Sequence, residues 1–116
     1  MGDSFQGVKN IIVQPGSATV PYTFTFAACS SATANDGSIP FGTTISSAIV
    51  KAFDETGTDS TAALISAQSV ASPVVTVSLK WPTAAGRYSL EFVLTLSTAA
   101  VMEFDFTRVY AEDTAV

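Results

Sequence analysis

The sequence contains no histidine and a single cysteine, Cys29, among its 116 residues. Without histidine, Ser-His-Asp and Cys-His catalysis, histidine metal ligands and the commonest general base are excluded. One thiol can form neither an internal disulfide nor a thiolate zinc site. We therefore expect Cys29 to be an unreactive thiol in a chain that folds in the reducing cytoplasm.

Charged side chains are also scarce, at 13% of the residues, about half the usual share. The five basic residues are scattered and the net charge is −5, which excludes a basic surface for a nucleic acid. No apolar run approaches the ~18 residues that a membrane span needs. The first residues lack the charged and apolar regions of a secretory signal. We expect synthesis in the cytoplasm, with neither a membrane nor a nucleic acid as a partner.

The clearest pattern lies in residues 86–110, where apolar and polar residues alternate in two runs separated by residues 97–100. Alternation with a period of two is typical of half-buried β-strands. We predict an antiparallel hairpin whose inner faces supply the largest share of the core. The residues expected to point inward are Tyr88, Leu90, Phe92, Leu94, Leu96, Met102, Phe104 and Phe106.

Shorter strands are predicted upstream of this hairpin. Residues 18–28 and 75–81 alternate clearly, and Pro21 favours an edge strand or a bulge. Residues 8–14 form a short apolar run that ends at a Pro-Gly turn. Residues 62–67 fit an extended segment, with a helix over residues 60–69 as the alternative because alanine and leucine favour helices.

Residues 45–53 form a strand whose two faces are less distinct. Strict alternation would place Ile45, Ile49 and Phe53 on one face, opposite Ala48, Val50 and Ala52. Residues 29–40 form a polar loop with Asn35, Asp36 and Gly37 at its tip. About seven short strands without a convincing amphipathic helix predict an all-β fold, a β-sandwich. We expect one domain over residues 1–116, with its ordered core at about residues 8–111.

The segment Gly86-Arg87-Tyr88-Ser89-Leu90 resembles the corner of immunoglobulin-like sandwiches. There a tyrosine at the start of the sixth strand bonds back to the preceding backbone, two residues before a core cysteine. Here Gly86 and Tyr88 are the corner residues, and Leu90 stands at the cysteine position. The resemblance implies an immunoglobulin-like β-sandwich of about seven antiparallel strands in which an aliphatic pair replaces the disulfide.

Residues 42–113 resemble small Ig-like domains of bacteriophage and prophage structural proteins, such as tail and adsorption-apparatus subunits. The resemblance lies in GTTISSAIVKAFDETGTDSTAALIS, VVTVSLKWPTAAGRYSLEFVLTLS and VMEFDFTRVYAED. It implies a non-enzymatic virion protein that forms protein–protein contacts with other structural proteins or with copies of itself, as a homo-oligomer. It implies no catalytic residue, no cofactor and no metal.

Two acidic groups have both a chemical and a structural interpretation. Asp54, Glu55 and Asp59 could bind calcium, but their spacing does not follow an EF-hand loop and favours a solvated turn. Glu103 and Asp105 share an outward face, with Glu91 across from them. Paired carboxylates serve glycoside hydrolysis, whereas on an open sheet they keep the protein soluble and discourage edge pairing.

Most aromatic side chains fall on the inward alternation and are expected in the core. Four others, near strand ends or in turn-rich segments, are candidate interface residues: Phe5, Phe41, Trp81 and Tyr110. They leave an alternative function open, a carbohydrate- or cell-surface-binding module that uses the loops at one end of the sandwich.

Overall fold

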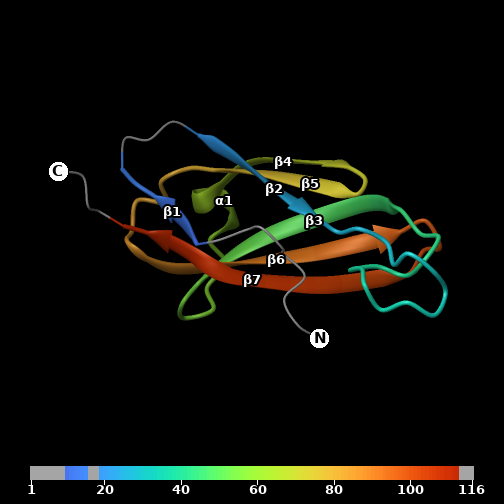
Figure 1. Ribbon diagram of the computed structural model, residues 1–116. Helices are drawn as coiled ribbons and strands as arrows, with labels where there is room; N and C mark the ends of the chain where they lie inside the picture. The colour runs from blue at the N-terminus through green and yellow to red at the C-terminus, as the bar shows by residue number, and fades with distance from the viewer. Residues whose placement is uncertain (1–9, 16–18, 113–116) are drawn as a thin grey trace.

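A computed structural model of the chain describes residues 10–15 and 19–112, in which seven strands and one short helix form two packed layers (Figure 1). The larger sheet has the strand order β1 (Ile11–Val13), β7 (Val101–Ala111), β6 (Gly86–Leu96) and β3 (Ile45–Asp54). The smaller sheet has the order β2 (Val20–Thr25), β5 (Val74–Leu79) and β4 (Ile65–Ala71). Strand β1 is parallel to β7, and all other neighbours are antiparallel. The predicted all-β class is confirmed.

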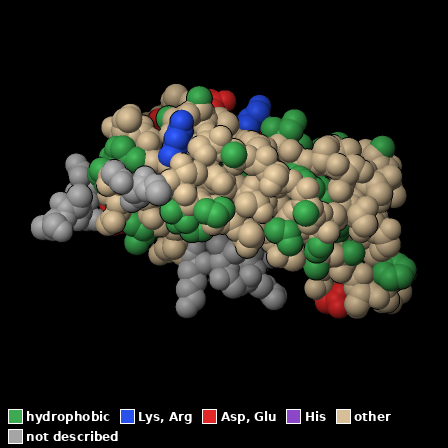
Figure 2. Space-filling model, turned by 90° about the horizontal axis from the view of Figure 1, so that it is seen from above, with side chains coloured by type: hydrophobic (Ala, Val, Ile, Leu, Met, Phe, Trp, Pro, Cys, Tyr) green, Lys and Arg blue, Asp and Glu red, His purple; other side chains and the backbone are tan. Residues whose placement is uncertain are grey.

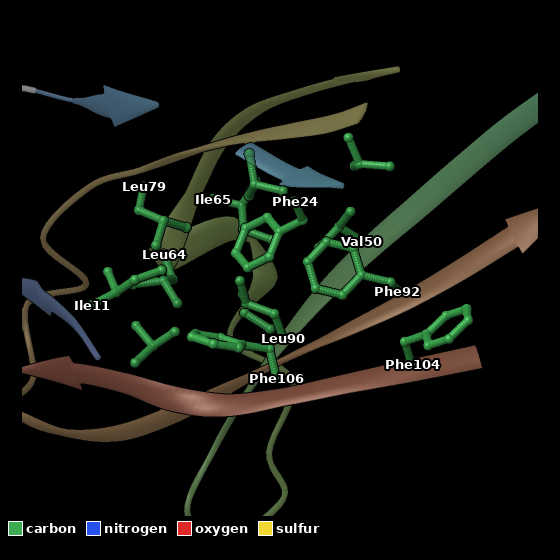
Figure 3. Close-up of a cluster of buried hydrophobic side chains, with 14 of the residues drawn as sticks. Ile11, Phe24, Val50, Leu64, Ile65, Leu79, Leu90, Phe92, Phe104 and Phe106 are labelled. Atoms are coloured by element: carbon green, nitrogen blue, oxygen red, sulfur yellow. The ribbon is translucent and has the colours of Figure 1, made fainter. Parts of the chain in front are cut away.

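The core lies between the two sheets and is rich in phenylalanine. Phe24 of β2 packs on Phe92 of β6 with ring centroids 4.7 Å apart, and Phe26 packs on Phe104 at 5.0 Å. Figure 3 shows Phe24, Phe92 and Phe106 converging from the two layers. The inward residues predicted for the hairpin are all buried, except Met102, which is partly buried against the same core.

A β-bulge near the start of β3 changes which residues of that strand face inward. The register with β6 shifts between Ile45 and Ser47, and a bulge of this kind exchanges the faces of a strand. Ile45 is buried before the shift, Val50 and Ala52 are buried after it, and Ile49 is 58% exposed. The expectation that Ile45 and Ile49 share a face is therefore wrong.

A second bulge interrupts β7. Tyr88 pairs with Val109 and Leu90 with Phe106, so three steps of β7 match two steps of β6. Because of this extra residue, Val109 and Ala111 point into the core after Phe106. The alternation predicted for the second arm of the hairpin therefore holds only as far as Phe106.

The segment after β3 contains both structures that its sequence favours. Helix α1 (Thr61–Leu64) lasts one turn and buries Leu64, and the chain then continues directly into β4. The segment is thus helical first and extended afterwards. No helix in the described ranges has the length and apolarity needed to cross a membrane.

Two edge strands have features that discourage pairing with another chain. Pro21 lies in β2, an edge strand of the smaller sheet, as predicted. Strand β3 is an edge of the larger sheet, and side chains form hydrogen bonds with the backbone groups on its unpaired side. Ser72 Oγ accepts from Ile45 N at 3.0 Å, and Thr61 Oγ1 accepts from Ala52 N at 3.0 Å.

Candidate functional site

The two corner residues lie where β6 begins. The Tyr88 hydroxyl donates a 2.8 Å hydrogen bond to the Ala84 carbonyl, four residues upstream. Burial raises the pKa of Tyr88, and the carboxylates of Asp54 and Glu55 raise it further. Gly86 has a φ of +149°, and a Cβ added there would lie 3.3 Å from Glu55 Oε1. The corner therefore packs closely against the acidic turn that follows β3.

Hydrogen bonds within the acidic turn orient the carboxylates of Asp54 and Asp59. Asp54 Oδ1 accepts from Thr56 N at 2.9 Å, from Thr56 Oγ1 at 2.6 Å and from Thr58 N at 3.0 Å. These bonds lower the pKa of Asp54, led by the bond from the Thr56 side chain. Asp59 Oδ1 accepts from Thr61 N at 2.9 Å, and the bonds from Thr61 lower its pKa.

The calcium hypothesis for this turn finds no support in the geometry. Within residues 10–15 and 19–112, no cluster of three or more Asp, Glu, Cys or His side chains is arranged to hold a metal ion. The Asp54 carboxylate organises the turn in the way that Asx residues usually do.

A surface hollow of about 290 Å³ lies between this turn and the outer face of the larger sheet. Phe53 is opposite Ser89 in the register of β3 and β6, and Thr107 follows in β7 at the second bulge. The bulge increases the local twist of the sheet, and the turn after β3 projects beyond the sheet (Figure 1). The lining residues are Phe53, Asp54, Glu55, Gly57, Arg87, Tyr88, Ser89 and Thr107.

The smaller sheet presents a very different surface. Strands β2, β4 and β5 contain no Asp, Glu, Lys or Arg, whereas β3, β6 and β7 all contain charged residues. Thr23, Thr76 and Ser69 lie side by side across the smaller sheet. Figure 2 views the molecule from this side and shows few charged side chains on it. This face, formed by the outward residues of β2, β5 and β4, is called the neutral face below.

The candidate interface aromatics do not come together. Phe41 is 55% exposed in the connection before β3, while Trp81 is partly buried against the core. Tyr110 is partly buried and lies opposite Arg87 at the start of β6, so it is at the other end of the larger sheet from Phe41. Phe5 lies outside the described residues.

The carboxylates considered for glycoside hydrolysis lie on an open sheet face. Glu103 and Asp105 lie on the same outward face of β7, as the alternation predicts, with Glu91 opposite Asp105 and Val93 opposite Glu103. Glu103 and Asp105 are exposed, and none of the three lines the hollow. Cys29 is partly exposed, and its backbone N–H donates to the Ile39 carbonyl at 2.9 Å.

Sequence reasoning missed both the hollow and the neutral face. The hollow depends on the β7 bulge, which brings Ser89 and Thr107 beside the acidic turn. No residue type in the sequence predicts this bulge. The neutral face did have a signal, because residues 10–35 and 60–79 contain no charged side chain.

No protein-family model matches the sequence, and no curated protein matches it significantly. The function is therefore inferred from the geometry and chemistry of the described residues.

Proposed function

We propose that the protein is a non-enzymatic structural subunit that acts through protein–protein contacts, as an Ig-like sandwich of the kind found in bacteriophage particles. The observation that carries the proposal is the neutral face, an extended sheet surface without charge in its strands. Charged residues are depleted at the centres of protein interfaces, because burying an unpaired charge is costly.

Two features support the Ig-like part of the proposal. Lettered A to G in chain order, β2, β5 and β4 correspond to the B-E-D group and β7, β6 and β3 to the G-F-C group of immunoglobulin sandwiches. Only the first strand differs from the constant-type arrangement, since β1 joins the larger sheet. The Tyr88–Ala84 hydrogen bond is also of the kind that a tyrosine corner makes.

The proposed occupant of the neutral face is a second copy of the chain. Its outward residues are small or β-branched, such as Thr23, Ser69 and Thr76, so little side-chain entropy is lost when they pack. The other face of the sandwich carries charges, including Lys51, Glu91 and Asp105 in adjacent register positions. The neutral face is therefore the better surface for self-association.

Light scattering over a range of protein concentrations tests this assignment. We expect the measured mass to exceed that of a monomer and to rise with concentration. The Thr76→Lys variant should have the mass of a monomer. Thr95→Lys is the matched control. Like Thr76 on β5, Thr95 on β6 is a partly buried threonine on an inner strand, but it faces outward from the larger sheet. A monomer at every concentration, or an equal effect of both variants, would contradict the neutral-face interface.

A role in a phage particle has a separate test in the genome. We expect the neighbouring genes to encode capsid, portal or tail proteins. Neighbours that encode only metabolic enzymes would contradict the virion assignment while leaving the self-association measurement unaffected.

A further inference from the structure

The hollow beside the acidic turn lies on the face opposite to the neutral face and is lined by both polar and apolar groups. It offers the carboxylates of Asp54 and Glu55, the guanidinium of Arg87 and the hydroxyls of Ser89 and Thr107. The ring of Phe53 is partly exposed within the same lining. Its volume of about 290 Å³ is just below the ~300–1,000 Å³ usual for small-molecule sites. We propose that this hollow binds a neutral carbohydrate, one or two sugar rings in size.

The charges of the lining select this class of ligand. Two carboxylates against one guanidinium repel an anion such as a phosphate or a sulfate. A cationic ligand would pair with the carboxylates, but the Arg87 guanidinium would repel it. Each hydroxyl of a sugar both donates and accepts, so a sugar satisfies the carboxylates, the guanidinium and the hydroxyls together.

The acceptor side of the hollow is held in place before any ligand binds. Asp54 Oδ1 is bonded by Thr56 and Thr58, which orients the carboxylate and keeps it ionised. The buried Tyr88 ring and the bond from its hydroxyl to Ala84 fix the start of β6, which lines the hollow. Groups already ordered in the free protein lose little entropy on binding, which favours affinity for the ligand.

The experiment is an amide-resolved NMR titration of the intact chain. The probes are glucose, galactose and N-acetylglucosamine, each added to millimolar concentrations, with arginine amide and inorganic phosphate as charged comparisons. We expect at least one sugar to give saturable shift changes centred on residues 53–57, 86–89 and 107. The two charged probes are expected to leave these amides unchanged.

Arg87→Ala is expected to weaken the sugar affinity about tenfold, as the loss of a hydrogen bond to a charged group does. Lys51→Ala is the matched control. It removes a positive charge from the same sheet face, two residues along β3 from Phe53 and outside the hollow. Its affinity should remain within about twofold of the unmodified protein, since it makes no contact with the ligand.

Three outcomes would overturn the proposal. They are no saturable shift with any of the sugars, saturable binding of arginine amide or phosphate in their place, or equal effects of Arg87→Ala and Lys51→Ala. The dispersed amide spectrum of each variant shows that it is folded. The hollow and the neutral face are on different sheets, so sugar binding and self-association succeed or fail independently.

Discussion

The side-chain amide of Gln68 on β4 bonds both backbone groups of Val50 on β3. Gln68 Oε1 accepts from Val50 N at 2.8 Å, and Gln68 Nε2 donates to Val50 O at 3.0 Å. The amide thus takes the place of a neighbouring strand at the edge of the larger sheet. An edge strand with satisfied backbone groups is a poor template for pairing with another chain, which favours association through a sheet face.

Gln68→Met keeps the length of this side chain and removes both bonds. We expect it to lower the free energy of unfolding by about 1–3 kcal/mol, the net value of two such hydrogen bonds. Urea unfolding followed by tryptophan fluorescence measures the change. Ser69→Ala is the control, since Ser69 is the next residue of β4 and faces outward; a loss equal to that of the control would show that the Gln68 bonds contribute nothing.

Removing the Tyr88 hydroxyl tests the corner. Tyr88→Phe keeps the buried ring and deletes the bond to Ala84, so we expect a loss of about 1 kcal/mol. The measurement is the shift of the urea midpoint at a constant slope. Tyr110→Phe, at a partly buried tyrosine on β7, should change the midpoint less. No loss in Tyr88→Phe would mean that water replaces the bond at no cost.

The same tyrosine predicts how stability changes at high pH. The pKa of Tyr88 is raised above its ordinary value of 10.0, first by burial and then by Asp54 and Glu55. The unfolded chain therefore loses this proton at a lower pH than the folded one. The contribution of Tyr88 is complete below pH 10 and is lost as the pH rises through the folded-state pKa. Between pH 8 and 11, the melting temperature of the unmodified protein should fall more steeply with pH than that of Tyr88→Phe. Parallel curves would contradict the raised pKa.

The strands could be predicted from the sequence to the extent that alternation is uninterrupted. Leu90, Phe92 and Phe104 were placed correctly because a period of two over several residues has one interpretation. Ile49 was placed wrongly because a bulge adds one residue and reverses the faces beyond it. A bulge depends on the pairing of two distant strands, so no local pattern reveals it.

The hollow could not be predicted for a related reason. Its lining comes from the end of β3, the turn after it, the start of β6 and the bulge of β7. The acidic turn and the Gly86–Tyr88 corner were each recognised, but their proximity depends on the register between β3 and β6. Contacts of that kind follow from the packing of distant segments, whereas the turn itself follows from local Asx chemistry.

Truncation of Phe92 tests the core between the sheets. Its ring lies 4.7 Å from that of Phe24 and 5.3 Å from that of Phe26, measured between centroids, and it is fully buried. Phe92→Ala should therefore cost about 3–5 kcal/mol, from lost burial and the cavity that remains. Val93→Ala, at the next residue, changes a partly exposed outward side chain and should cost about 1 kcal/mol or less. A loss below about 1 kcal/mol for Phe92→Ala would mean that the register is wrong.

The final prediction concerns Gly37, at the tip of the longest polar loop. A Cβ on this residue would lie 2.5 Å from Cys29 N, 2.6 Å from Ala27 O and 2.6 Å from Ala28 C, all backbone atoms. Ser38 N donates to Ala27 O at 2.7 Å beside this contact. The loop is therefore packed against residues 27–29, although its composition resembles that of a loose surface segment.

Gly37→Ala must separate these two segments, and we expect it to cost about 1–3 kcal/mol from overpacking and weakened hydrogen bonds. Gly42→Ala is the matched control in the same connection, since it has a φ of +79° and no other atoms within 4 Å of the added carbon. Its cost should be about 1–2 kcal/mol from backbone strain alone. Hydrogen exchange distinguishes the two causes, because Gly37→Ala should remove the protection of the Cys29 and Ser38 amides and Gly42→Ala should not. Protection retained at both amides in Gly37→Ala would show that the loop accommodates a side chain there without opening.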